Sequence, residues 1–128
     1  MFEALGMSGS GMDVHKAWMD AISDNISNIN TVRRTSDPAF QTRYVVATSK
    51  DGGGVEVAGI ALSSAVGKLT SDPTNPLADA NGLVRMPDVD LGEQLTTMIM
   101  AQRGYQANIS QLDRVKAAYQ SAIQMGRG

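Results

Sequence analysis

Few side chains in this sequence have types suited to catalysis or metal binding. His15 is the single histidine among 128 residues, and its nearest carboxylates along the chain are Asp13 and Asp20. A metal site or a general base needs several groups that converge on one point, and two carboxylates at this spacing do not supply them. We therefore interpret His15 as a packing or solvent-facing residue.

Three acidic residues, Asp88, Asp90 and Glu93, lie close together before a predicted helix. Carboxylates in such a cluster can bind a cation, but the start of a helix favours the same residue types as caps. No twelve-residue calcium loop surrounds them. We predict capping, with a loss of about 1 kcal/mol for each aspartate replaced by asparagine. An enzyme with a cation at Asp88 and Asp90 is a distant alternative.

Other candidate chemistry also has a structural explanation. The run "DGGGVEV" precedes a strand and has no Lys-Ser/Thr pair after it, so it is not a phosphate loop. Three of the eight methionines, Met12, Met19 and Met98, fall on helical faces, where adaptable packing explains them. The sequence has no cysteine and no Ser-His-Asp or paired-carboxylate pattern. We predict no enzymatic activity, catalytic residue, metal or cofactor.

Composition and charge limit the classes of partner. The chain is 42% hydrophobic but only 5% aromatic, which fits one modest domain or an elongated one completed by partners. A net charge of -2, mixed along the chain, predicts no nucleic-acid partner. The chain has no apolar run of about eighteen residues, so we expect no direct membrane insertion. The N-terminus lacks the regions of a secretory signal, so we expect any export to proceed without a cleaved signal peptide.

The N-terminal part predicts a firm helix from about Met12 to Asn30, preceded by a frail turn or two. Three glycines before Asp13 each cost about 1 kcal/mol of helix propensity relative to alanine. Helical spacing places apolar side chains on two neighbouring lines, and Ser8 and His15 occupy the remaining positions of the second line. These side chains are Leu5, Met12, Met19, Ile22, Ile26 and Ile29.

Residues 31–87 predict a small β-rich insert. "FQTRYVVAT" and "GVEVAGIAL" alternate polar and β-branched residues and predict two strands joined through residues 50–54. Asn81-Gly82 favours a tight turn before the short run Leu83–Met86. The insert has too little apolar mass to be very stable alone.

A second helix is predicted from just after Pro87, with Asp88 or Asp90 as N-cap, to about Met125, a length of about 54 Å. Its residues fall in two parallel rows, which we call the bulky seam and the small-residue seam. The bulky seam consists of Leu91, Leu95, Met98, Gln102, Tyr105, Ile109, Leu112, Lys116, Tyr119 and Ile123. The small-residue seam consists of Thr97, Ala101, Gly104, Asn108, Gln111, Val115, Ala118 and Ala122.

Two such seams can accept two neighbouring helices, and the first helix covers only one of them. The surplus face predicts an assembly protein, although a solvated alanine-rich face is the simpler alternative. We expect Gly104 to let a second backbone approach closely, so that Gly104→Leu leaves a soluble monomer and blocks assembly. Gln102 and Asn108 are expected to select the correct pairing, as a seam asparagine does in coiled coils.

The predicted fold is mainly α with a small β-rich insert. Residues 1–32 and 88–128 form long terminal helices paired as an antiparallel coiled coil, and residues 33–87 form a central β-hairpin and loop segment. The predicted assembly interface combines side chains from both helices: Leu5, Met12, Met19, Ile22, Ile26, Ile29, Leu95, Met98, Gln102, Gly104, Tyr105, Asn108, Ile109, Leu112 and Tyr119.

Three stretches together resemble the flagellar basal-body rod protein family, above all its proximal-rod members. They are "DNISNINT" (24–31), "NPLADANGLVRMPDVDLGEQL" (75–95) and "AQRGYQAN" (101–108). Ile26, Leu83 and Asp88 replace the family's more usual leucine, tyrosine and asparagine, and residues 33–39 depart from its commoner continuation. The matching positions are Asn25, Asn28, Asn30, Thr31, Asn75, Pro76, Gly82, Met86, Pro87, Tyr105, Gln106, Ala107 and Asn108.

The resemblance implies a non-enzymatic subunit of the rod, the hollow shaft that carries motor torque across the periplasm and lets export substrates pass. It implies export by the flagellar type III apparatus. The implied partners are further copies of the chain, the rod proteins FlgB, FlgF and FlgG, and the adaptor FliE. A helical-hairpin adaptor or chaperone that binds one partner is the alternative function.

Overall fold

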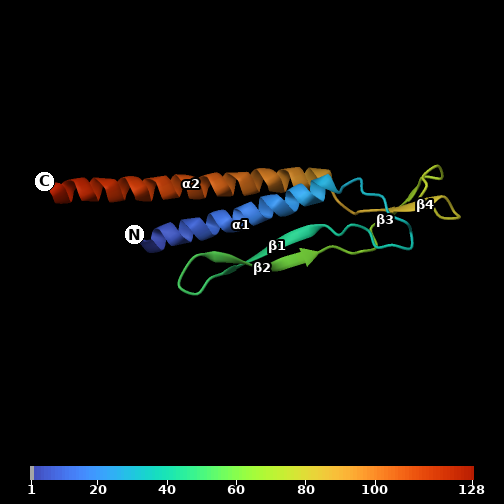
Figure 1. Cartoon of the computed structure of the whole chain (residues 1–128), viewed down its shortest axis with the longest axis horizontal. Coiled ribbons are helices and arrows are strands. Elements are labelled where there is room, and N and C mark those ends of the chain that lie inside the picture. Colours follow the sequence, from blue (N-terminus) through green and yellow to red (C-terminus); the bar gives the residue numbers. More distant parts are fainter. Residues whose placement is uncertain (1) are drawn as a thin grey trace.

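A computed structural model describes residues 2–128, and its two helices run antiparallel side by side in the part of the molecule that holds both termini (Figure 1). Helix α1 spans Phe2–Ser27 and helix α2 spans Leu91–Arg127. Between them come strands β1 (Arg43–Ser49), β2 (Val55–Leu62), β3 (Lys68–Ser71) and β4 (Leu83–Met86). The predicted fold class, mainly helical with a small β insert between two long helices, is confirmed.

Helix α1 begins earlier than predicted, because the turns at residues 2–11 are helical as well. Tertiary contacts compensate for the weak propensity of the three glycines. Gly11 lies so close to α2 that a β-carbon there would be 2.6 Å from the Asn108 Oδ1 atom. Ser10 does not cap the helix; its hydroxyl donates to the Met7 carbonyl at 2.8 Å and accepts from the Val55 amide at 3.2 Å. The helix ends at Ser27, three residues before the prediction.

Strands β1 and β2 form an antiparallel hairpin, as predicted, that lies along α1 (Figure 1). The register shifts between Val46 and Ala47, whose partners are Gly59 and Val57, so that β2 carries a bulge at Ala58. The loop at Gly52–Gly54 has positive φ angles that glycine adopts without strain. Val45, Ala47 and Val55 face Val14 and Trp18 of α1 across an apolar cavity.

The second sheet, β3 with β4, forms the end of the molecule away from both termini (Figure 1). Strand β3 was not predicted, since its four residues carry little apolar pattern. Strand β4 also bridges to Arg33, whose amide donates to the Arg85 carbonyl at 2.8 Å. The Arg85 guanidinium donates to the Thr35 carbonyl at 2.7 Å and to the Val66 carbonyl, so it holds the connecting loops to the sheet.

Helix α2 has 37 residues, so it is about 56 Å long. The predicted cap is confirmed, with Asp90 as N-cap and its side chain accepting from the Glu93 amide at 3.0 Å. Contacts between Gly11 and Asn108 and between His15 and Gly104 fix the antiparallel register. In that register about ten residues at the end of α2 extend beyond the start of α1. We call residues 116–127 the C-terminal overhang, and all of them are exposed.

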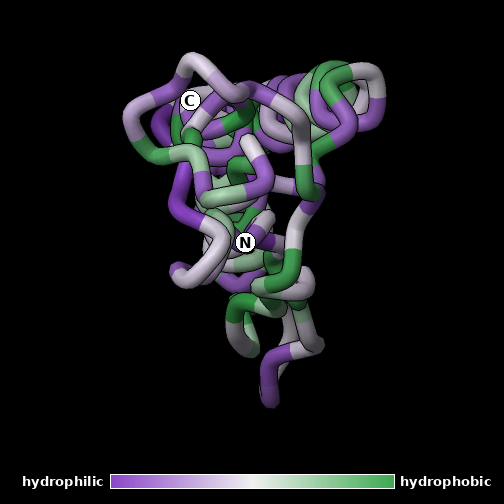
Figure 2. The backbone as a smooth tube through the Cα atoms, turned by 90° about the vertical axis from the view of Figure 1, so that its right-hand side faces the viewer, coloured by the Kyte–Doolittle hydropathy of each residue, from purple (hydrophilic) through white to green (hydrophobic). Residues whose placement is uncertain are grey.

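The molecule has a small, discontinuous core. Viewed along the long axis, apolar segments are scattered among polar ones (Figure 2). The buried apolar side chains are Val14, Ala21, Ile22, Ala39, Val84, Val89 and Ala101. A core this thin leaves many large apolar side chains on the surface, which is the starting point for the functional site.

Candidate assembly interface

The small-residue seam of α2 is the one that packs against α1 of the same chain. Ala101 is fully buried there, and a β-carbon at Gly104 would overlap the His15 ring. The expectation that Gly104 receives a neighbouring subunit is therefore wrong: the close approach is between α1 and α2 within one chain. A leucine at this position would separate the two helices instead of leaving an intact monomer.

The bulky seam of α2 forms the edge of the helix pair and continues onto the surface. Met98, Tyr105, Ile109 and Leu112 are half-buried. Gln102 is exposed, so it has no buried amide with which to select a pairing inside one chain. Four seam residues that leave between 39% and 49% of their surface exposed are Leu91, Leu95, Tyr119 and Ile123. This face is the surplus apolar surface that the sequence predicted.

Three further exposed large apolar residues on α2, Ile99, Met100 and Met125, lie outside both predicted seams. Ile99 follows Leu95 by four residues, which places the two side chains one turn apart on the same face. This spacing of four residues is the sequence signal from which Ile99 could have been assigned to the exposed face. The exposed face of α2 is thus wider than a single coiled-coil seam.

Helix α1 packs on two sides, which shifts its buried residues relative to the predicted lines. Ile22, on a predicted line, is 2% exposed. Leu5, Met12, Met19, Ile26 and Ile29 are half-buried. Gly11, Val14, Ala21 and Asn25 are buried although they lie off those lines, because α2 covers one face of α1 and the β1–β2 hairpin covers another. Heptad spacing describes one packed face and could not show that the hairpin makes a second.

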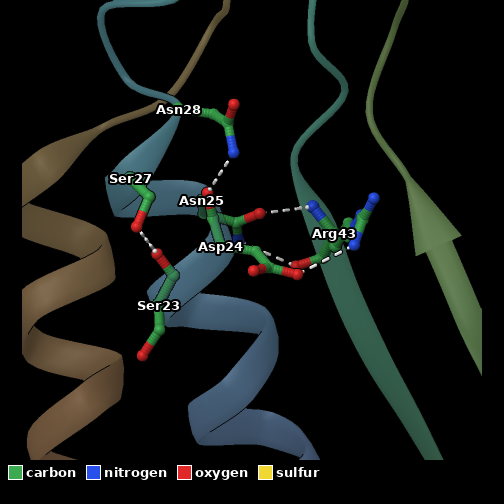
Figure 3. Close-up of polar contacts among 6 residues, drawn as sticks. All are labelled: Ser23, Asp24, Asn25, Ser27, Asn28 and Arg43. Carbon is green, nitrogen blue, oxygen red and sulfur yellow. Dashed lines mark hydrogen bonds and ion pairs between the residues drawn. The ribbon is translucent and has the colours of Figure 1, made fainter.

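Asn25 joins three elements through one buried amide (Figure 3). Its Nδ2 group donates to the Arg43 carbonyl and to Gln94 Oε1, both at 2.9 Å, and its Oδ1 atom accepts from the Arg43 amide at 2.8 Å. Both N–H groups of the side chain and one acceptor position of its oxygen are therefore used. The sequence identified Asn25 only through the resemblance, since its partners Gln94 and Arg43 are far away along the chain.

The other asparagines of the first motif shape the end of α1. Asn28 Nδ2 donates to the Asp24 carbonyl at 2.9 Å, and its Oδ1 atom accepts from the Thr31 hydroxyl at 3.1 Å (Figure 3 shows the first of these). Asn30 is exposed. An exposed ion pair between Asp24 and Arg43, at 2.8 Å, lies beside this junction. The motif thus both closes α1 and attaches β1 to it.

The second motif builds the turns around β4. The Asn75 Oδ1 atom accepts from the Leu77 amide at 3.0 Å, in a turn that contains Pro76. Gly82 has a positive φ of 72°. Pro87 is buried and Met86 half-buried, so they lead the chain from the sheet into α2. Asp79, which the sequence did not single out, accepts from the Leu83 and Asn81 amides at 3.0 and 2.8 Å.

These hydrogen bonds affect the charge state of Asp79. The bond from the Leu83 amide, with the Asn81 amide and the Thr35 hydroxyl, holds the pKa of the Asp79 carboxyl below its ordinary value. Burial opposes this effect. A second shift is found nearby, where the exposed carboxylate of Asp88 lies 2.9 Å from Lys68 Nζ and raises the pKa of that lysine.

The third motif places its four residues on different faces of α2. Asn108 is half-buried against Gly11 of α1, and its Nδ2 group donates to the Gly104 carbonyl at 2.9 Å. Tyr105 is half-buried, whereas Gln106 and Ala107 are exposed. Gln106 and Ala107 are thus free to meet a neighbour.

The candidate chemical groups have structural partners. His15 Nδ1 lies 2.7 Å from the Gly11 carbonyl, and its ring packs near Trp18 with centroids 6.1 Å apart. Asp90 caps α2, and Asp88 pairs with Lys68. Among residues 2–128, no three histidine or acidic side chains are grouped so that they could hold a metal ion. Over the same range, no helix has the length and apolar character needed to cross a membrane.

Comparison with known proteins identifies the family of this two-helix architecture. Residues 80–125, which include all but two residues of α2, match the family described as flagellar basal body rod FlgEFG protein C-terminal. The flagellar basal-body rod protein FlgC of Salmonella typhimurium is 33% identical over 126 residues, covering 94% of each chain. The FlgC proteins of Borreliella burgdorferi and Bacillus subtilis are 27% and 26% identical and cover 100% and 98% of this chain.

The similarity extends over both helices and the central strands, as the resemblance of three separate motifs predicted. The chain belongs to the family of the flagellar basal-body rod protein FlgC.

Proposed function

We propose that this chain is a structural subunit of the proximal part of the flagellar rod, where it assembles with copies of itself and with other rod proteins. The observation that carries the proposal is the second apolar face of α2, which its own chain leaves uncovered. Leu95 and Tyr119 are 49% and 44% exposed on this face. Apolar surface of this extent on a thin, elongated molecule is typical of a part completed by its neighbours.

In this proposal the two terminal helices form the inner wall of a hollow shaft, and residues 33–87 lie outside it and contact neighbours. FlgB, FlgF, FlgG and FliE are the proposed partners, and the flagellar type III apparatus exports the chain without a cleaved signal peptide. The role is mechanical, not enzymatic. Close α1–α2 packing at Ala101 and Gly104 supports the stiffness that torque transmission needs.

The test places a charge on the exposed apolar face and leaves the packing within the chain unchanged. Leu95→Glu is introduced into the native gene, and Ser110→Glu, at an exposed position of α2 outside both seams and the family motif, serves as the matched control. We expect both purified proteins to have wild-type helicity by circular dichroism. Only Leu95→Glu should abolish intact rods in electron micrographs and swimming in soft agar.

Normal rods with Leu95→Glu would show that this face is not an assembly surface. Sedimentation of the purified protein with each rod protein distinguishes a structural subunit from the alternative, an adaptor that binds one partner. A discrete one-to-one complex that never grows would favour the adaptor, whereas larger particles would favour the structural subunit.

A further inference from the structure

The exposed side of α1 carries a regular acidic row. Asp13, Ala17, Asp20 and Asp24 are spaced by four, three and four residues, so they share one helix face, and the three aspartates are exposed. A groove of about 260 Å³ runs beside this row, between α1 and the hairpin. Its lining includes Ala17, Ala21 and Ile60, and Ile60 is 51% exposed. Arg43 also lines the groove and pairs with Asp24 at 2.8 Å, so Asp13 and Asp20 are the aspartates of the row without this cation. We call this surface the acidic groove.

The C-terminal overhang carries a complementary row. Lys116, Gln120, Ile123 and Arg127 have the same spacing of four, three and four residues and share one face of α2. Tyr119 lies next to this row, at 44% exposure. The overhang is therefore basic at both ends and apolar between them.

The two rows match in length, charge and order. The first and last residues of each row are eleven positions apart, which is about 16 Å of helix. In an antiparallel arrangement Arg127 meets Asp13 and Lys116 meets Asp24. Ile123 then falls on the small residue Ala17, next to Ile60, where the groove can accept it. A parallel arrangement would place Ile123 on the carboxylate of Asp20, and desolvating that charge without a partner is unfavourable.

The overhang cannot reach the acidic groove of its own chain. The groove lies beside the middle of α1, whereas the overhang begins past the first residues of that helix (Figure 1). Ala17 is about 22 Å along the helix from Phe2. The occupant must therefore come from another molecule.

We propose that the C-terminal overhang of one copy docks antiparallel on the acidic groove of a second copy. This inference rests on the proposed function as a rod subunit and specifies one contact within it. Each copy then presents one overhang and one groove, so the contact is head-to-tail and can link many copies in series. The apolar contact supplies affinity, and the two exposed ion pairs set the orientation, because such pairs are individually weak.

Cysteine cross-linking tests the contact directly, since the sequence has no cysteine of its own. Ile60→Cys and Ile123→Cys proteins are made separately, mixed and oxidised mildly, with Ser110→Cys replacing Ile123→Cys as the control. All three positions are exposed, so the fold is expected to survive. We expect a disulfide-linked dimer from the Ile60→Cys and Ile123→Cys mixture at several times the yield of the control. Equal yields would overturn the proposal.

Charge exchange tests the orientation. Asp13→Arg and Arg127→Asp are each expected to weaken self-association at least fivefold in sedimentation experiments, and an equimolar mixture is expected to restore it. Arg103→Asp, which changes an exposed charge of α2 outside the row, should leave association unchanged. Failure of the mixture to recover would contradict the antiparallel pairing.

The same cysteine variants, placed together in one gene and examined in rods isolated from cells, separate this inference from the proposed function. Rods that contain the chain but form no link between positions 60 and 123 would refute the docking contact alone. Absence of the chain from the rods would refute the function itself.

Discussion

Single polar side chains, more than apolar mass, decide how the parts of this molecule are joined. Asn25 is completely buried and holds α1, β1 and α2 together through one amide group. A buried amide stabilises little when it is paired, but an unpaired one is unfavourable, so wrong arrangements of the hairpin are penalised. For a rod subunit that must fit against other rod components, this selectivity matters more than maximal stability.

Replacing Asn25 therefore has a large expected effect. Asn25→Ala leaves Gln94 Oε1 and both backbone groups of Arg43 without their partner, and we expect a loss of about 2–3 kcal/mol in the free energy of unfolding. Urea denaturation followed by circular dichroism measures it. Ser27→Ala, which removes an exposed hydrogen bond to the Ser23 carbonyl, is the control and should change stability by less than about 0.5 kcal/mol. Equal losses in both variants would contradict this assignment.

Gly104 provides a second test at the residue scale. Alanine has a helix propensity about 1 kcal/mol better than glycine, yet its β-carbon would overlap the His15 ring. We expect Gly104→Ala to destabilise the chain by about 1–3 kcal/mol, because His15 must move. Gly9 lies in α1, and a β-carbon added there would meet nothing within 4 Å, so Gly9→Ala should stabilise the chain by about 1 kcal/mol.

A double-mutant cycle identifies the cause. In a His15→Ala background the obstacle is gone, so the same Gly104→Ala change should become neutral or stabilising in thermal denaturation. A Gly104→Ala change that is equally harmful in both backgrounds would show that another neighbour is responsible.

At the scale of elements, each boundary depends on a local hydrogen bond that tertiary packing then reinforces. Helix α2 starts where the Asp90 side chain accepts from the Glu93 amide. Asp88, two residues earlier, instead pairs with Lys68 at the surface. Two acidic residues with similar sequence contexts therefore have different structural roles.

We expect Asp90→Ala to lower the free energy of unfolding by about 1 kcal/mol, the usual value of an N-cap. Asp88→Ala should lower it by less than about 0.5 kcal/mol, because an exposed ion pair contributes little. Asp90→Asn should be nearly neutral, since asparagine caps as well as aspartate, and this replaces the loss of about 1 kcal/mol that we expected from the sequence. Denaturant titrations of the three variants check the order, and a larger loss at position 88 would reverse the assignment.

The turn before β4 predicts a pH dependence. The Asp79 pKa is lowered chiefly by the Leu83 amide, so the native state favours the charged carboxylate. Its stabilising contribution is therefore full above the unfolded pKa and is lost as the pH falls through the lower, folded pKa. NMR titration of this carboxyl should give a pKa below 3.8. Thr35→Ala removes one donor and should move that pKa upward, and an unchanged or lower value would contradict the proposed hydrogen bond.

At the scale of the whole molecule, an elongated chain with a thin core leaves its ends weakly held. The C-terminal overhang has no α1 beside it, and an isolated helix of about twelve residues is marginal in water. The first turns of α1 contain three glycines and depend on contacts with the hairpin loop and α2. Both ends are therefore expected to gain order on assembly.

Amide hydrogen exchange measures this gain. In the free chain, residues 116–127 should exchange much faster than residues 94–105, and in assembled rods the difference should largely disappear. Total helicity by circular dichroism should rise on assembly for the same reason. Full protection of the overhang in the free chain would contradict both expectations.

Much of the fold could be predicted from the sequence because its signals are local. Helical periodicity located α2, the Asp90 cap located its start, and alternation located β1 and β2. Strand β3 was not predicted, because its four residues show no alternation of polar and apolar side chains. The early start of α1 was not predicted, because the low helix propensity of glycine disfavours a helix there and only tertiary contacts stabilise it.

The sequence by itself determined that α2 has two faces, since the residue types at each spacing are fixed along the chain. Only the tertiary structure decided which face is internal. Gly104 and Ala101 allow α1 to approach within one chain, while Leu95 and Tyr119 stay outside. Periodicity gives the angle of a side chain around its own helix, but the choice of neighbour depends on how α1, α2 and the hairpin pack together, which no local pattern encodes.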